Sequence, residues 1–195
     1  MASGVGLVFP GQGSQSVGVG RGFYDANPMA RMVYEEAAAV LGYDVAALCF
    51  EGPADRLNLT EYTQPALLTA SIAALRVLEP AGIVPVAVAG HSLGEYSALV
   101  AAGGVGFRSA LSLVQKRGRY MAEAVAPGSG MVAAILGLAG DVVRDACRDA
   151  SSIGVVAPAN FNCPGQIVIA GEKAAVKRAI EIAKAKGCRK AISLP

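Results

Sequence analysis

The sequence contains a single histidine, His91, among its 195 residues, and this scarcity limits the chemistry that the chain can support. Zinc sites in proteins draw on histidines and on closely spaced cysteines. The four cysteines show no C-x-x-C spacing, so the sequence predicts no metal site. They are expected to be reduced thiols, as in a cytoplasmic protein. These cysteines are Cys49, Cys147, Cys163 and Cys188.

Charged residues are also scarce, at 16% of the chain, and their net charge is only +2. This balance excludes the strongly basic surface that binding to nucleic acid or to a membrane surface requires. Two stretches, residues 1–20 and 150–171, carry no charge, but glycine, proline, serine, asparagine and glutamine interrupt both. Neither is therefore predicted to cross a membrane. Because the N-terminus has no basic segment, no signal peptide is expected.

Apolar residues, in contrast, make up 53% of the chain. This proportion fits a sheet that helices cover on both faces, because the strands of such a sheet are apolar throughout. It also fits a fragment whose missing part covers some of the apolar surface.

The most informative motif is the pentapeptide GHSLG at residues 90–94, which follows the apolar run Val84–Ala89 and precedes a helical segment. A buried strand that turns through G-x-S-x-G into a helix is typical of a nucleophile elbow, where the two glycines allow a tight turn. Ser92 is therefore predicted to be an acyl-enzyme nucleophile. The backbone N–H of Leu93 is predicted to stabilise the oxyanion.

The pattern around this motif predicts an α/β fold with parallel strands. Residues 1–127 are expected to form the first domain, in which strands alternate with helices. Its predicted strands are 5–9 and 84–89, and its predicted helices are 29–41, 65–78, 93–102 and 107–125.

Residues 128–195 follow a different pattern and are expected to form a second, smaller domain. The order strand, helix, strand, strand, helix, strand is that of the ferredoxin-like unit. The expected strands are 131–136, 153–160, 166–170 and 189–194, and the expected helices are 141–150 and 173–186.

An activated serine normally needs a base, most often a histidine. His91 precedes Ser92 on the turn, which aims its side chain away from the serine. It is therefore interpreted as a packing or hydrogen-bonding residue under the turn rather than as the base. The base is then either absent from these 195 residues or not a histidine, and we adopt the first interpretation.

Arg117 lies within the apolar stripe of the helix predicted over 107–125. A guanidinium that points inward is costly unless a carboxylate pairs with it. Arg117 could pair with an internal acidic residue or extend along the edge of the stripe to solvent. Alternatively, it could bind a carboxylate of the substrate.

The loop Gly11-Gln12-Gly13 follows the first strand and could bring a second backbone N–H to the oxyanion. Ser16 stands where a dinucleotide-binding motif has its third glycine, so no nucleotide cofactor is predicted. Several amide side chains lie near predicted element ends, where turn and cap roles are common. These are Gln64, Asn160, Asn162 and Gln166.

Taken together, five motifs along the chain resemble those of the malonyl-CoA:acyl carrier protein transacylase family. They occur in the family's order and at appropriate spacing over the whole chain. They are FPGQGSQ at 9–15, TQPA at 63–66, GHSLGEY at 90–96, Arg117-Gly118 with Met121, and NFNCPGQ at 160–166.

This resemblance implies an α/β-hydrolase-like large subdomain with a ferredoxin-like small subdomain. It implies that Ser92 takes a malonyl group from malonyl-CoA and passes it to the phosphopantetheine thiol of acyl carrier protein, for fatty acid biosynthesis. No cofactor is implied, and a cytoplasmic monomer is expected. The resemblance assigns the oxyanion hole to the N–H groups of Gln12 and Leu93, the malonyl carboxylate to Arg117, and the pocket lining to Met121, Gln64 and Asn160.

In this family the base is a histidine just after the small subdomain, and the sequence reaches Pro195 at about the place where that segment should begin. The chain is therefore interpreted as truncated and catalytically incomplete. Other interpretations remain open: an esterase or thioesterase of α/β-hydrolase fold, an acyltransferase domain of a polyketide synthase, or a non-catalytic fragment that binds carrier protein or coenzyme A thioesters.

Overall fold

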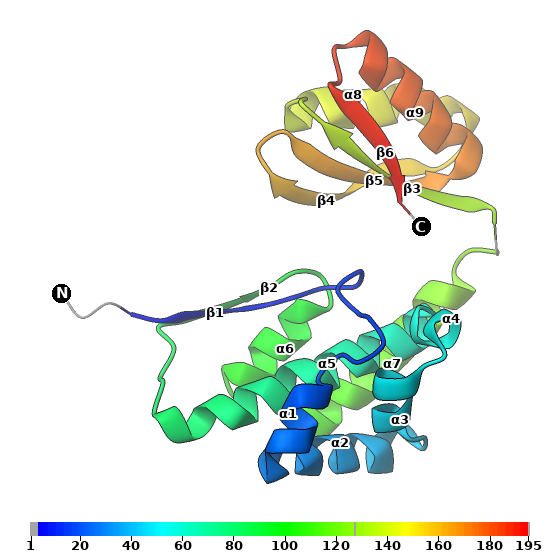
Figure 1. The fold of residues 1–195 in the computed structure, drawn as a ribbon. Coiled ribbons are helices and arrows are strands. Elements are labelled where there is room, and N and C mark those ends of the chain that lie inside the picture. Colours follow the sequence, from blue (N-terminus) through cyan, green and yellow to red (C-terminus); the bar gives the residue numbers. More distant parts are fainter. Residues whose placement is uncertain (1–3, 127, 195) are drawn as a thin grey trace. The chain divides into compact units, whose positions relative to one another are not determined.

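The computed structural model describes residues 4–126 and 128–194. The chain divides into two compact units, Met1–Ala124 and Val125–Pro195, each with its own buried core (Figure 1). The domain boundary expected between residues 127 and 128 involves Pro127, which lies outside the described residues.

The first unit combines a parallel pair of strands with a group of helices. In its described part, β1 (Gly6–Phe9) pairs with β2 (Ala87–Gly90), with Gly6 opposite Ala87 and Phe9 opposite Gly90. The helical elements are α1 (Arg21–Ala26), α2 (Pro28–Leu41), α3 (Val45–Glu51), α4 (Ala54–Leu57), α5 (Thr60–Leu78), the 3₁₀ turn η1 (Glu79–Ala81), α6 (Gly94–Ala101) and α7 (Phe107–Glu123).

Only one face of this strand pair is well covered. Phe9 is buried, whereas Val8, the preceding residue on the opposite face, is 81% exposed. The buried strand expected over residues 84–89 is wrong in two respects. The strand begins at Ala87, and Val84 and Val86 before it are 82% and 75% exposed. Among the described residues no third strand flanks this pair, and the side chains of Val84 and Val86 remain exposed.

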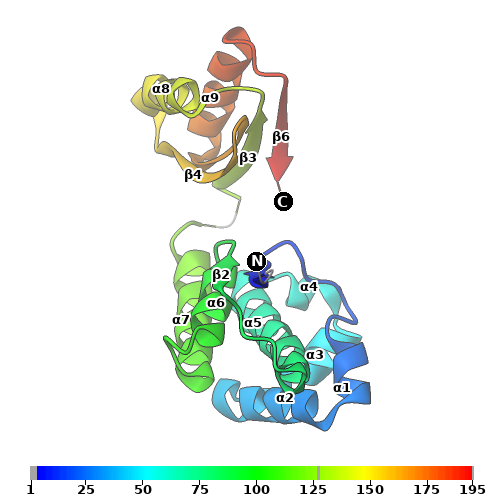
Figure 2. The same ribbon diagram turned by 90° about the vertical axis from the view of Figure 1, so that its left-hand side faces the viewer.

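Helix α5 is the centre of the first unit's core and packs against α2, α6 and α7 (Figure 2). It begins at Thr60, five residues before the predicted start, so Pro65 lies inside the helix. The prediction was wrong because proline favours the first turn of a helix, which made Pro65 look like the beginning. The sequence pattern missed α1, α3 and α4, since four to seven residues are too few to show a helical period.

The second unit has the predicted β-α-β-β-α-β order. Its described strands form one antiparallel sheet in the order β4-β5-β3-β6, and α8 and α9 cover one face of it (Figure 1). The elements are β3 (Gly130–Leu136), α8 (Gly140–Ala150), the 3₁₀ turn η2 (Ser151–Ile153), β4 (Val156–Cys163), β5 (Gln166–Glu172), α9 (Lys173–Ala185) and β6 (Lys190–Leu194).

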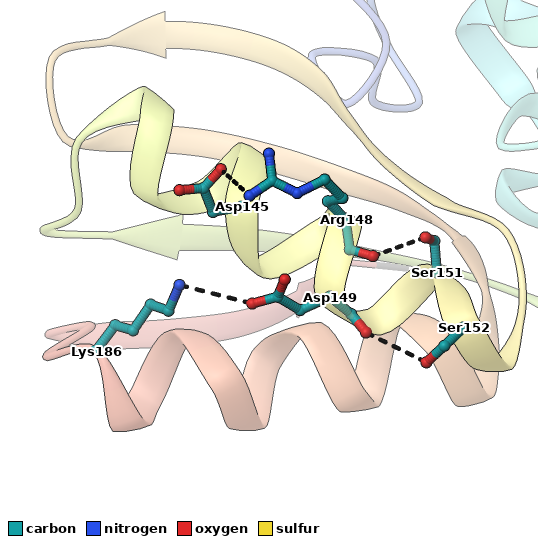
Figure 3. Close-up of polar contacts among 6 residues, drawn as sticks. All are labelled: Asp145, Arg148, Asp149, Ser151, Ser152 and Lys186. Carbon is teal, nitrogen blue, oxygen red and sulfur yellow. Dashed lines mark hydrogen bonds and ion pairs between the residues drawn. The ribbon is translucent and has the colours of Figure 1, made fainter.

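The C-terminal end of α8 is secured by a set of polar contacts (Figure 3). The hydroxyls of Ser151 and Ser152 donate to the carbonyls of Arg148 and Asp149, over 2.7 and 3.3 Å. These bonds add acceptor partners at the end of the helix, where the Arg148 carbonyl also accepts from the Ser151 N–H. The Asp149 carboxylate also lies 3.8 Å from the Lys186 ammonium, just past the end of α9. Both side chains are substantially exposed, so this pair contributes little to stability.

Across residues 4–126 and 128–194, every helix is too short or too polar to cross a bilayer.

Candidate active site

Ser92 lies on a tight turn between β2 and α6. The strand ends at Gly90, the helix begins at Gly94, and Ser92 between them has a positive φ of 52°. A non-glycine residue in this left-handed region is uncommon and marks local strain at functional sites. Strand, strained serine and helix together form the geometry of a nucleophile elbow.

Glycines make this turn possible because the backbone segments approach one another closely. A Cβ on Gly90 would overlap the carbonyl group of Gly94, and a Cβ on Gly94 would overlap the carbonyl of Phe9 at the end of β1. A Cβ on Gly11 would lie 2.5 Å from the carbonyl oxygen of His91. The loop after β1 is therefore in direct contact with the serine turn.

The side chain of His91 lies against this loop. Its Nδ1 atom is 2.7 Å from the position that a Cβ on Gly11 would occupy. The imidazole thus contacts the segment that follows β1.

Arg117 on α7 extends to the serine. Its Nη2 donates to Ser92 Oγ over 3.1 Å, and its Nη1 donates to Gln64 Oε1 over 2.8 Å. Its guanidinium also lies 5.9 Å from the ring centroid of Tyr96, one turn after Ser92 on α6. Among the described residues, no carboxylate forms an ion pair with Arg117. Of the three interpretations left open by the sequence, internal pairing with an acidic residue is thereby removed.

Gln64 is the residue that holds the guanidinium. It lies on α5 with 0% of its side chain exposed, and its Nε2 lies 3.3 Å from the sulfur of Met121. The expectation that an amide at this position caps a helix is wrong, because the helix begins four residues earlier, at Thr60. Buried amides need partners, and Gln64 finds them in Arg117 and Met121.

The crossing of α5 and α7 sets the position of Arg117. Gly118, the next residue, is buried, and a Cβ there would lie 2.8 Å from both the carbonyl oxygen of Thr60 and the Cα of Glu61. Only glycine allows the two helices to approach so closely without displacement. Because Arg117 is adjacent, its backbone is fixed relative to the start of α5.

Two backbone N–H groups, one on the loop that contacts the serine turn and one on the turn itself, have no protein acceptor among the described residues. Within the described part of the chain, neither Gln12 N–H nor Leu93 N–H donates to another protein group. Leu93 N–H also lies at the N-terminal end of α6, where the helix dipole favours negative charge. Backbone N–H groups without a protein acceptor are the kind of donor that an oxyanion hole uses.

Asn160 lies in the second unit, on β4, opposite Val168 of β5. Cross-strand partners point to the same face of a sheet. The residues on either side of Val168 in β5 are Ile167 and Ile169. Both point to the helix-covered face and belong to the core under α8 and α9. Asn160 therefore lies on the face without helices.

The sequence analysis did not identify three residues as contributors to the site: Thr60, Tyr96 and Gly118. Two of them stood inside the quoted motifs, Tyr96 four residues after the serine and Gly118 directly after Arg117. Helical spacing alone could have placed Tyr96 on the serine's side of α6. Thr60 carried no signal, because its role depends on where α5 begins.

Among residues 4–126 and 128–194, no group of three or more histidine, cysteine, aspartate or glutamate side chains is placed to hold a metal ion.

Comparison with known proteins places this geometry in context. The sequence model of the acyl transferase domain family matches residues 7–193. The malonyl CoA-acyl carrier protein transacylase of Escherichia coli K12 is 52% identical over 190 residues, which are 97% of this chain and 62% of that protein. The transacylase of Bacillus subtilis 168 is 47% identical over 191 residues, or 97% of this chain and 60% of that protein. The chain thus spans about three fifths of the length of these relatives.

Solved structures show the same similarity. The acyl carrier protein S-malonyltransferase of Vibrio cholerae superposes with a TM-score of 0.94 at 48% identity, covering 99% of this chain and 63% of that one. A malonyl-transacylase in complex with a type II polyketide synthase acyl carrier protein gives a TM-score of 0.93, also at 48% identity. That superposition covers 98% of this chain and 62% of the other.

Proposed function

The chain belongs to the acyl transferase domain family, and on this premise we propose that it is the serine-bearing part of a malonyl-CoA:acyl carrier protein transacylase. Residues 1–127 are assigned to the subdomain that carries the serine, and residues 128–195 to the ferredoxin-like subdomain. The activity is placed in fatty acid biosynthesis in the cytoplasm, in agreement with cysteines that are free in the described structure. The names of the relatives support malonyl-CoA and acyl carrier protein as substrates.

The observation that carries this proposal is the guanidinium of Arg117 beside the serine hydroxyl, without an acidic partner among the described residues. Arginine binds carboxylates through two parallel hydrogen bonds. A malonyl thioester carries a free carboxylate at one end and the reacting carbonyl at the other. Arg117 would hold the carboxylate, which places the carbonyl next to Ser92 Oγ.

The reaction proceeds in two transfers. Ser92 Oγ attacks the thioester carbonyl of malonyl-CoA, its proton passes to a base, and the carbon–sulfur bond breaks as the coenzyme A thiol leaves with a proton. The phosphopantetheine thiol of the carrier protein then attacks the serine ester, and Ser92 regains its proton. In both transfers the N–H groups of Gln12 and Leu93 would stabilise the negative oxygen of the tetrahedral intermediate.

Other protein groups would complete this site. Gln64 keeps the guanidinium in place, and Met121 beside it forms an apolar wall of the acyl pocket. Asn160 is proposed to contact the substrate from the ferredoxin-like subdomain. The proton acceptor is proposed to be a histidine outside these residues, since the sequence offers only His91.

Intact mass before and after incubation with malonyl-CoA tests the proposal. In the full-length protein that contains these residues, we expect one malonyl group to be added to the wild type and none to Ser92→Ala. Arg117→Ala is expected to reduce the rate with malonyl-CoA by about 100-fold or more, because a charged hydrogen-bonded pair contributes several kcal/mol. The same variant should react with acetyl-CoA, which lacks the carboxylate, at the wild-type rate. Arg119→Ala is the matched control, since Arg119 on the same helix pairs with Glu123 in solvent.

The rival functions give different results. Equal losses with malonyl-CoA and acetyl-CoA would show that Arg117 does not read the carboxylate, which favours an esterase or thioesterase. Binding of malonyl-CoA without any covalent adduct would favour a non-catalytic binding fragment.

A further inference from the structure

The loop that follows β1 is tied to the start of α5 by side-chain amides. Gln15 uses both ends of its amide: Oε1 accepts from Gly13 N–H over 2.8 Å, and Nε2 donates to Asn58 Oδ1 over 2.9 Å. A parallel bond runs from Gln12 Nε2 to Thr60 Oγ1, over 3.1 Å. We call the bonded set Gly13, Gln15 and Asn58 the amide clamp.

The clamp acts on a segment that would otherwise have wide conformational freedom. The loop contains two glycines, and Gly13 has a φ of +102°. Glycine adopts positive φ values about as readily as negative ones, so its own preference does not fix this conformation. The clamp selects one conformation by binding the Gly13 N–H. That bond also occupies the donor next to Gln12, so the Gln12 N–H is the one left for an anion.

The same short segment of chain fixes the other side of the site. Asn58 and Thr60 lie at the junction of α4 and α5, where the backbone of Thr60 touches Gly118 of α7. Arg117 is the neighbour of Gly118. One rigid junction therefore contacts both the loop that carries Gln12 and the helix that carries Arg117.

We propose that Gln15 and Asn58 are positioning residues that hold the Gln12 N–H at a fixed place relative to Ser92 and Arg117. The proposal rests on the function proposed above, in which Gln12 N–H stabilises the oxyanion. Neither side chain touches the reacting atoms. Their effect passes through the Gly13 N–H and the loop backbone.

The test compares four variants of the full-length protein that contains these residues, for the rate of malonyl-Ser92 formation. Gln15→Ala and Asn58→Ala remove the clamp, whereas Asn58→Asp keeps an oxygen that can accept from Gln15 Nε2. Ser16→Ala is the control from the same loop, since its side chain makes no hydrogen bond within the described residues. Deleting an oxyanion donor costs about 100-fold to 1000-fold in rate, so a displaced donor should cost about tenfold.

The form of the loss separates positioning from general destabilisation. At saturating malonyl-CoA, Gln15→Ala and Asn58→Ala should form malonyl-Ser92 about tenfold more slowly than the wild type. The half-saturating concentration of malonyl-CoA should change less than about twofold, because Arg117 is unchanged. Asn58→Asp should restore the wild-type rate. Wild-type rates in both alanine variants, or an Asn58→Asp variant as slow as Asn58→Ala, would overturn the proposal.

Hydrogen exchange provides a readout that does not depend on acylation. In Gln15→Ala the Gly13 N–H loses its bond to Gln15 Oε1, so exchange of the Gly13 amide should be about tenfold faster. Ser16→Ala should leave the exchange rate of the Gly13 amide unchanged. Absence of malonylation in the wild type would refute the proposed function alone. Unchanged Gly13 exchange in both clamp variants would refute the clamp, whatever the acylation result.

Discussion

The sheets of the two units differ in how many neighbours each strand has. In the described first unit, β1 and β2 each have one, and Val8 is 81% exposed. In the second unit, β3 and β5 each have two, and Ile135 and Ile169 on them are 1% exposed. Parallel strands normally occur in sheets with both faces covered. The second unit therefore buries the centre of its sheet with its own residues, whereas the first leaves a face of its sheet open.

Buried polar residues show the same contrast. Within the described residues, the buried polar side chains all lie in the first unit: Thr63, Gln64, Thr69 and Ser97. Gln64 binds Arg117, and Thr63 and Thr69 donate to backbone carbonyls. A core that accepts polar groups gives up some apolar burial. In the described structure, the first unit thus buries a polar side chain, Gln64, at the candidate site, while the buried side chains of the second unit are apolar.

The largest difference between the units is expected in the loss of unfolding free energy when one glycine of each unit is replaced by alanine. Gly90→Ala places a Cβ onto the backbone of Gly94, so the elbow must open, and we expect a loss of about 3 kcal/mol or more in unfolding free energy. Gly187 follows α9, and a Cβ there would lie more than 4 Å from any neighbouring atom of the described residues. The strain of a side chain at its φ of 93° is then the main cost of Gly187→Ala, about 1 kcal/mol of unfolding free energy. Urea unfolding measures both.

Tyrosine fluorescence sharpens this test because all six tyrosines lie within residues 1–124 and the chain has no tryptophan. It follows the first unit alone, and circular dichroism follows both. Equal losses for Gly90→Ala and Gly187→Ala would show that the elbow tolerates a side chain, contrary to its geometry.

A smaller effect is expected in the local stability of the two sheets. A two-stranded sheet is marginal, whereas central strands exchange only through larger openings. The β1–β2 amides, such as Val88, should open at a free energy about 2 kcal/mol below that of β3 and β5, which is roughly 30-fold faster exchange. Hydrogen exchange followed by mass spectrometry measures this. Similar protection in both sheets would mean that the open face of β1 and β2 does not weaken their pairing.

The sequence predicted the second unit more accurately than the first, because the strands of the second unit pair with one another in one self-contained sheet. A self-contained antiparallel sheet shows its periods locally, so each of its strands and helices lies within a few residues of its prediction. In the first unit, the start of α5 was wrong because Pro65 carries a helix-start preference that the surrounding core overrides. The short helices α1, α3 and α4 carried no periodic signal.

For the site, motif spacing predicted which residues matter but not how they contact each other. The G-x-S-x-G pattern was enough to predict the turn at Ser92, because only glycine fits the close backbone approaches at positions 90 and 94. The position of Arg117 in an apolar stripe left three interpretations. Its bonds to Gln64 and Ser92 depend on the close crossing at Gly118, which joins segments more than fifty residues apart in sequence. Such a contact has no local signature.

The smallest expected difference is in the response to alkaline pH. Burial, with a smaller effect of Asp44, raises the pKa of Cys49 in the first unit to about 12, and burial raises that of Cys147 in the second to about 11, from an ordinary 9.0. Burial also raises the pKa of Tyr34 and Tyr43, both in the first unit. Above pH 9 the unfolded chain releases thiol protons that the folded chain keeps, so stability falls as pH rises.

Because Cys49, Tyr34 and Tyr43 all lie in the first unit, and Cys147 in the second, the first unit should lose stability more steeply. The loss from Cys49 alone should be about 1 kcal/mol near pH 10. Urea unfolding at several pH values, followed by circular dichroism and, for the first unit alone, by tyrosine fluorescence, should show a shallower pH slope for Cys49→Ala than for the wild type. Cys147→Ala is the matched control and should leave the first unit's slope unchanged. A wild-type slope in Cys49→Ala would mean that the thiol is already ionised in the folded chain, and that this core is more open to solvent than its packing implies.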